Sequence, residues 1–239
     1  MTYCVAIKTK SGIVALSDGR ITAGTQMTSA RKASLHGEGQ NRFFIMTSGL
    51  RSIRDKTVAY LEQQMEQQGF EFSTMLDAIS AYTHNLRRVE LEDRTYVERA
   101  DIAFYLHTII GGMMGADKEP RVFLVYPQGN WIELEQMTPY LTIGNVSYGK
   151  PILDRTLSYD TDLRTALKVA YLSFDSTKFS SSDVGFPIDL ITMTMPDRTW
   201  REAHLKNADV RDLREWWNTN IKNLVEQAPD AQWLHTLAP

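Results

Sequence analysis

Residues 2–20 read TYCVAIKTKSGIVALSDGR, with two apolar runs on either side of a Ser-Gly pair. In the first run Tyr3, Val5 and Ile7 share one face of a β-strand and the intervening residues share the other, which is the strand period of two. Residues 13–17 form a second short apolar run, and a Ser-Gly pair between two such runs is typical of a tight turn. The stretch therefore predicts a β-hairpin that ends in a polar cluster with a glycine.

The rest of the chain predicts helices in blocks between strands. In chain order we expect strands at 42–47, helices at 51–68 and 73–92, strands at 102–110, 121–126, 131–135 and 140–143, a helix at 161–174, a strand at 188–194 and a helix at about 209–227. Strands that are not each followed by a helix favour antiparallel pairing. We therefore predict an α+β fold, a four-layer αββα sandwich of two antiparallel sheets flanked by helices.

Local signals set the expected element boundaries. Ser73 is placed to cap the second helix, and Asp160 or Thr161 the third. Gly69 separates the first two helices, and a stretch rich in Thr, Ser and Gly, residues 21–30, follows the hairpin.

Length and composition restrict the classes of function. The 239 residues suit one domain, 1–239, that includes a C-terminal helix and tail at about 205–239. A net charge of -3 gives no support for a nucleic-acid surface, and no apolar run approaches a membrane span. The single cysteine, Cys4, excludes a disulfide framework within one chain, and the five histidines show no metal-binding spacing. We expect a cytoplasmic protein without a cofactor or metal.

The second residue raises the question of catalysis. A threonine hydroxyl is a weak nucleophile and needs a base close by. If Met1 is removed, the α-amino group of Thr2 becomes available as that base, since its ordinary pKa is ~7.7–8.0. A lysine nearby would lower the pKa of the amine by like-charge repulsion, an aspartate would hold the lysine, and a backbone N–H would stabilise the oxyanion.

The chain contains each of these parts. Asp18 ends the second strand, which hairpin geometry returns to the start of the first. Lys32 follows fourteen residues later, and Ser48-Gly49 closes a strand just before a predicted helix. A glycine N–H at a helix N-terminus is a suitable oxyanion donor.

This constellation, together with MTYCVAI at the start, SDGR at 17–20, RK at 31–32 and IGNVSYGKPILDR at 143–155, resembles the proteasome-type β-subunits. These belong to the threonine branch of the N-terminal-nucleophile (Ntn) hydrolases, and within them the chain looks most like the bacterial Anbu group. A weaker likeness is SFDSTKFSSSDVGFPIDL at 173–190. The family's sandwich agrees with the predicted order of elements.

The resemblance implies peptide-bond hydrolysis by an N-terminal threonine. Carried over, Thr2 is nucleophile and base, Asp18 and Lys32 tune it, and the Gly49 N–H stabilises the oxyanion. The resemblance also places three residues in the wall of the substrate pocket: Ile21, Thr47 and Ser48. A second group around the threonine amine maps less uniquely, onto Asn145 or Ser147 and onto Ser182 and Asp183.

Two other functions stay open on the sequence. One is an amidase acting on a non-peptide substrate, because Ntn folds also cleave small amides and fold does not fix function. The other is a non-catalytic assembly subunit. The resemblance implies self-association into a ring or an open helix, and since no G-x-x-x-x-G-K-[ST] motif is present, any ATP-driven unfolding would come from a separate unfoldase.

Overall fold

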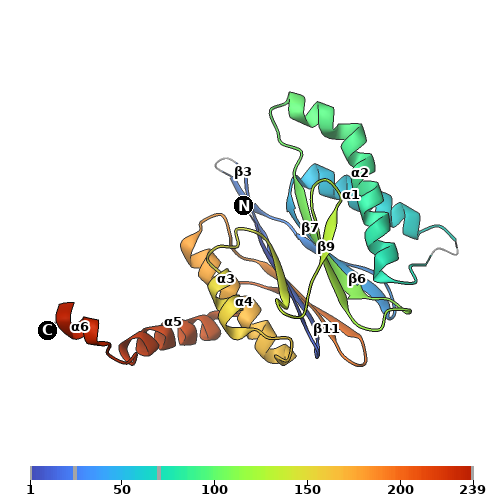
Figure 1. Ribbon diagram of the computed structural model, residues 1–239. Helices are drawn as coiled ribbons and strands as arrows, with labels where there is room; N and C mark the ends of the chain where they lie inside the picture. The colour runs from blue at the N-terminus through green and yellow to red at the C-terminus, as the bar shows by residue number, and fades with distance from the viewer. Residues whose placement is uncertain (1, 24–25, 69–70, 238–239) are drawn as a thin grey trace.

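The computed structural model describes residues 2–23, 26–68 and 71–237. Met1 and Gly69, which the sequence analysis uses, lie outside these residues. Figure 1 shows two sheets packed together, with helices on their outer sides and one helical arm leading away from the body.

The first sheet has five strands in the order β10-β1-β2-β11-β12. All of its pairs are antiparallel. Its strands are β1 (Tyr3–Thr9), β2 (Gly12–Asp18), β10 (Tyr140–Gly144), β11 (Ile188–Thr194) and β12 (Thr199–Leu205). The predicted hairpin is β1 and β2. Because β2 lies between β1 and β11, this hairpin pairs with a strand much later in the sequence.

The second sheet also has five antiparallel strands, in the order β5-β6-β7-β8-β9. These are β5 (Ala33–Glu38), β6 (Asn41–Gly49), β7 (Leu106–Met113), β8 (Arg121–Val125) and β9 (Trp131–Glu133). A separate two-stranded ribbon is formed by β3 (Arg20–Ala23) and β4 (Gln26–Ser29).

Helices cover the outer face of each sheet. On the second sheet lie α1 (Arg51–Met65) and α2 (Met75–Arg99), and on the first lie α3 (Lys150–Thr156) and α4 (Leu163–Ser180). The arm consists of α5 (Arg211–Glu226) and α6 (Gln232–Leu237). Among the described residues, no helix combines the length and the apolar character that crossing a membrane requires.

Three hydrophobic clusters hold the four layers together. Strand β1 shows why, because its two faces enter different clusters. Tyr3 and Val5 pack toward α4, whereas Cys4 and Ala6 pack between the two sheets. Every residue of β1 is buried, as a strand in the middle of a sandwich requires. The α+β prediction of two antiparallel sheets with helices outside is confirmed.

Several predicted boundaries need correction. The strand predicted at 102–110 begins only at Leu106 and continues past its predicted end, through Gly111 and Gly112 to Met113. A β-carbon at Gly111 would meet the Phe44 ring at 2.7 Å, so the glycine makes room for an aromatic side chain of the core. Helix α2 extends to Arg99, well past the predicted end at residue 92, because ion pairs continue along its exposed face.

The predicted helix caps are also corrected. The N-cap of α2 is Thr74 and not Ser73, and the N-cap of α4 is Asp162 and not Asp160 or Thr161. Both observed caps accept a hydrogen bond from the backbone N–H three residues on. The elements that the sequence analysis did not predict are β3, β4, β5, α3, β12 and α6.

Candidate active site

The hairpin brings Asp18 to the beginning of the chain. Cys4 pairs with Ser17 across β1 and β2, so Asp18 lies beside Tyr3. The Tyr3 N–H donates to Asp18 Oδ1 over 2.9 Å. The Asp18 side chain therefore lies next to the peptide that follows Thr2, as the hairpin geometry predicts.

Lys32 reaches the same carboxylate from the segment before β5. Its Nζ lies 2.7 Å from Asp18 Oδ1, and the two side chains are 10% and 0% exposed. Burial raises the pKa of the Asp18 carboxyl, and the Lys32 ammonium and the backbone N–H of Tyr3 oppose that rise. Removing either partner of this buried ion pair would leave the other charge buried and uncompensated, so the two side chains hold each other in place.

A third contact to Asp18 comes from the loop before β11. The Gly185 N–H donates to Asp18 Oδ2 over 3.3 Å, and the Gly19 N–H donates to the Pro187 carbonyl over 2.6 Å. The Arg20 guanidinium lies against Gly185, where a β-carbon would meet it at 2.4 Å, and donates to the Ser182 carbonyl over 2.6 Å. This loop thus supports the site through its backbone.

The carbonyl of Thr2 is fixed by the end of β10. The Asn145 N–H donates to it over 2.7 Å. Gly144, with φ of 89°, allows this approach, since a β-carbon there would lie 1.9 Å from the same oxygen. Thr2 is itself only 9% exposed. Its main chain is thereby held at a defined place at the head of β1.

Position 49 has room only for a glycine, because the surrounding backbone lies too close for a side chain. Its φ is 144°, and a β-carbon would lie 2.2 Å from the Tyr105 carbonyl oxygen. That carbonyl accepts the Leu50 N–H over 2.8 Å. The turn from β6 into α1 therefore passes close to the residue before β7, and a side chain at this position would force it apart.

These elements enclose a pocket of about 460 Å³. The lining residues are Thr2, Arg20, Ile21, Thr28, Ala30, Arg31, Lys32, Thr47, Ser48, Gly49, Arg51, Arg54, Tyr105 and Gly144. Such a volume is in the usual range of small-molecule and peptide side-chain sites. Thr2, Lys32 and Gly49, together with all three predicted wall residues, lie around this one space.

The residues of the predicted second group, around the threonine amine, do not all lie at Thr2. Asn145 contacts Thr2 through its backbone N–H, whereas Ser147 is exposed. Ser182 is exposed, and its backbone carbonyl accepts a hydrogen bond from Arg20. Asp183 is half-buried, and no contact of its side chain among the described residues places it at Thr2.

Sequence reasoning missed several functional neighbours, namely Gly144, Gly185, Tyr105, Arg51 and Arg54. The glycines were the available signal: the IGN motif contains Gly144 and the DVG motif contains Gly185.

Taken chemically, the arrangement offers a hydroxyl, an ammonium paired with a buried carboxylate, and a glycine backbone around a pocket. Such a set can activate a hydroxyl for nucleophilic attack on an amide carbonyl. Fixed backbone donors can then stabilise the negative charge that develops on the carbonyl oxygen. Among the described residues, no group of three or more His, Cys, Asp or Glu side chains could hold a metal ion.

Comparison with known proteins agrees with the family that the sequence motifs resemble. The family model for the proteasome subunit matches residues 2–193. The proteasome subunit beta 1 of Pyrobaculum aerophilum is 23% identical over 195 residues, which cover 81% of this chain and 90% of that protein. Its counterpart in Pyrobaculum calidifontis is 22% identical over 198 residues, covering 82% and 92%.

Solved structures extend the likeness to nearly the whole chain. The Anbu complex of Pseudomonas aeruginosa, solved as a helical assembly, superposes with a TM-score of 0.88 at 29% identity and covers 96% of this chain and 98% of that one. Anbu from Yersinia bercovieri gives a TM-score of 0.85 at 28% identity, with 96% and 99% covered. The chain therefore belongs to the proteasome subunit family and is similar, over almost its full length, to the Anbu proteins of that family.

Proposed function

We propose that this chain is a threonine-type peptidase whose nucleophile is Thr2, exposed by removal of Met1, and that it works within a homo-oligomer. One observation carries the proposal: Thr2 lines the same pocket as Lys32 and Gly49, and the Lys32 ammonium lies 2.7 Å from buried Asp18. The similarity to proteasome β-subunits supports amide hydrolysis as the reaction class.

In this mechanism the Thr2 Oγ1 attacks the carbonyl carbon of the scissile bond, and the α-amine of Thr2 accepts the hydroxyl proton. The Gly49 N–H stabilises the oxyanion. The tetrahedral intermediate collapses as the amine passes its proton to the leaving nitrogen, which leaves an ester between Thr2 and the acyl half. Water, deprotonated by the same amine, then hydrolyses the ester and regenerates Thr2.

The role of Lys32 in this scheme is electrostatic. A nearby ammonium favours the neutral form of the Thr2 amine, which is the form that can accept a proton. Asp18 keeps Lys32 in place, because its carboxylate also accepts the Tyr3 and Gly185 N–H groups. The aspartate is thus a positioning residue and does not itself contact the substrate.

The test is the intact mass of the purified protein before and after reaction with a peptide epoxyketone, which requires both the hydroxyl and a free amine. We expect loss of one methionine and a single covalent adduct. Thr2→Ala should abolish the adduct and lower peptide hydrolysis at least about a thousandfold, as removal of other catalytic nucleophiles does. Thr2→Ser keeps a hydroxyl and should keep both.

The opposite results are equally informative. A full-length mass without an adduct would contradict the proposal and point to an assembly subunit with a blocked terminus. An adduct accompanied by turnover of a small amide and none of any peptide would move the assignment to a non-peptide amidase.

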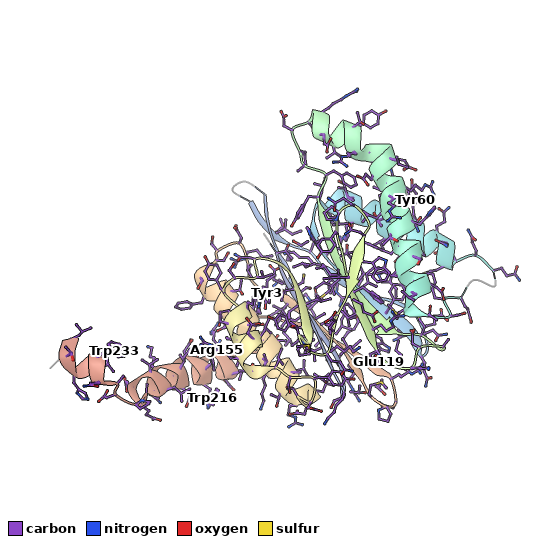
Figure 2. All side chains as sticks on the ribbon, in the orientation of Figure 1. Tyr3, Tyr60, Glu119, Arg155, Trp216 and Trp233 are labelled. Carbon is purple, nitrogen blue, oxygen red and sulfur yellow. The ribbon has the colours of Figure 1, made fainter. Side chains whose placement is uncertain are left out.

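Self-association is supported by the arm. Trp216 is 57% exposed, Leu224 62% and Trp233 61%, and Figure 2 shows both tryptophans on the arm, outside the body of the molecule. Only the beginning of α5 packs on the core, through Val210 and the partly buried Leu213 and Trp217. We propose that a second copy of this chain covers the exposed apolar side chains, since the similar Pseudomonas protein forms a helical assembly.

A further inference from the structure

The pocket beside Thr2 is lined by five cationic residues: Arg20, Arg31, Lys32, Arg51 and Arg54. No Asp or Glu is among the described residues that line it. The whole chain has a net charge of -3, so this concentration of positive charge is local. A cleft lined by one sign of charge concentrates ligands of the opposite sign.

The carboxylates behind the pocket neutralise these cations incompletely. Arg51 and Arg54 share a single carboxylate, Asp55, at 3.2 and 2.7 Å. Arg20 has a backbone carbonyl as its partner, and within the described parts of the chain it has no ion pair with a carboxylate. Of these five cations, Lys32 alone has a close carboxylate partner of its own among the described residues, namely Asp18.

Arg31 is held loosely by comparison. Its guanidinium lies 3.5 Å from Asp189 and 3.9 Å from Glu202, both beyond ordinary hydrogen-bond distance. Asp189 also accepts a closer contact from His204 at 2.7 Å. The Arg31 side chain is 59% exposed and is thus able to turn toward a bound anion.

The first turn of α1 adds to the positive field. Its N-cap, Leu50, makes no side-chain capping bond, and the turn contains no acidic residue. Arginines at a helix N-terminus oppose the helix dipole. Arg54 is nevertheless fixed there, donating to the Arg31 carbonyl over 2.8 Å, so its charge stays beside the pocket.

We infer that this pocket selects a carboxylate side chain, Asp or Glu, on the residue that supplies the acyl group to Thr2. The inference rests on the proposed function of Thr2 and names its substrate class. A side-chain carboxylate in the pocket meets Arg51, Arg54 and Arg31, whereas a lysine or arginine side chain meets only like charge. The acyl carbon of the same residue lies at the Thr2 hydroxyl.

The test compares peptide epoxyketones that differ only in the residue next to the reactive group, with Glu, Gln or Lys at that position. The rate of adduct formation at Thr2 is measured by intact mass on the full-length protein. Glu and Gln are nearly isosteric, so their ratio reports charge. We expect Glu to react at least about tenfold faster than Gln, with Lys slowest, because a hydrogen bond to a charged group contributes ~1.5–3 kcal/mol. The ratio should shrink in high salt.

Arg51→Gln should bring the Glu-to-Gln ratio toward one. Arg51 is 65% exposed, so the substitution leaves the core intact, and Arg54→Gln provides a second, more buried variant. Lys168→Gln removes an exposed cation from α4 on the opposite helical layer and should leave the ratio unchanged. A Gln or Lys probe that reacts as fast as the Glu probe would overturn the inference and leave the proposed nucleophile standing.

A binding measurement separates failure of the inference from failure of the proposed function. Fluorescein-labelled peptides with Glu or Gln at the same position are titrated against the full-length protein and followed by anisotropy. If no probe forms an adduct, tighter binding of the Glu peptide, lost in Arg51→Gln, supports the acidic-ligand pocket without Thr2 chemistry. Equal binding of the two peptides would overturn it.

Discussion

At Gly144 the chain passes so close to Thr2 that a β-carbon would lie 1.9 Å from the Thr2 carbonyl oxygen. Its φ of 89° is also in the region that favours glycine. We predict that Gly144→Ala lowers the free energy of unfolding by about 2 kcal/mol or more and abolishes adduct formation at Thr2, because the clash displaces the head of β1. Urea unfolding and intact mass measure the two effects.

Gly115→Ala is the matched control. The nearest atom to a β-carbon there is Asn41 Oδ1, at 3.7 Å, and no unusual φ is required. It should leave stability and adduct formation close to those of the native chain. If Gly144→Ala behaved in the same way, the proposed fixing of Thr2 by the end of β10 would be wrong.

His36 is a second residue whose environment has a measurable consequence. It lies on β5, is 8% exposed and stacks on Phe43 with ring centroids 5.5 Å apart. Burial lowers the pKa of its imidazole to about 4. Glu62 is 3.3 Å from Nδ1, but its side chain is 52% exposed, so water weakens the attraction that would favour the protonated ring.

The sign of the resulting pH dependence follows from the lowered pKa. The unfolded chain binds a proton on this histidine below pH ~6.5, whereas the folded chain binds it only near pH 4, so stability is full above pH ~6.5 and falls as the pH falls. The loss amounts to about 3 kcal/mol at most. His36→Gln should flatten the decline in unfolding free energy between these pH values, and His84→Gln, at an exposed position, should not. An unchanged slope in His36→Gln would contradict the prediction.

At the scale of elements, α2 shows how a helix beginning is chosen. Thr74 Oγ1 accepts the Asp77 N–H over 3.3 Å, and Asp77 Oδ2 accepts the Thr74 N–H over 2.8 Å, a reciprocal capping box. Asp77 also lies in the first turn, where it complements the helix dipole. This arrangement fixes the helix start one residue after the serine that sequence alone favours.

Thr74→Ala should lower the free energy of unfolding by about 1 kcal/mol, because the Asp77 N–H loses its acceptor. Thr74→Ser retains the hydroxyl and should cost much less. The neighbouring substitution Ser73→Ala is the control, since the Ser73 hydroxyl is not the cap, and it should change stability little. Equal losses from Ser73→Ala and Thr74→Ala in urea unfolding would show that the capping assignment is wrong.

For the molecule as a whole, the notable feature is the arm of α5 and α6, which leads away from the four layers (Figure 1). No residue of either helix is fully buried. Its exposed aromatic and aliphatic side chains are Trp216, Ile221, Leu224, Val225, Trp233 and Leu237. None of these side chains lines the pocket beside Thr2, so association through the arm is separable from the chemistry proposed at Thr2.

We predict that Trp216→Glu combined with Leu224→Glu lowers the molecular mass in solution, measured by sedimentation equilibrium, because charged side chains cannot be buried unpaired against a second copy. Thr219→Glu, at another exposed position of α5, adds the same charge as either substitution and should leave the assembly intact. Unchanged mass in the double variant would remove the arm from the proposed interface.

The sequence by itself determined what depends on neighbours a few residues apart. Alternation in the first seventeen residues indicated the hairpin and its two faces. Asp18 at the end of the second strand, Lys32 fourteen residues later and Ser48-Gly49 at the end of a further strand, together with the family resemblance, indicated the candidate site. It did not reveal β3 or β4, which are only four residues long, or β12, whose largely polar sequence lacks a clear period of two. Such strands are stable only because a partner strand supplies the hydrogen bonds.

Only the tertiary structure decided which distant segments meet at Thr2. The Gly185 N–H reaches Asp18 across 167 positions of sequence because β11 pairs with β2, and Asn145 reaches Thr2 because β10 pairs with β1. The positive charge of the pocket likewise arises where the ribbon, the segment before β5 and the first turn of α1 converge. None of these contacts leaves a local pattern, because each is specified by sheet register and packing across the whole sandwich and not by the propensities of its own segment.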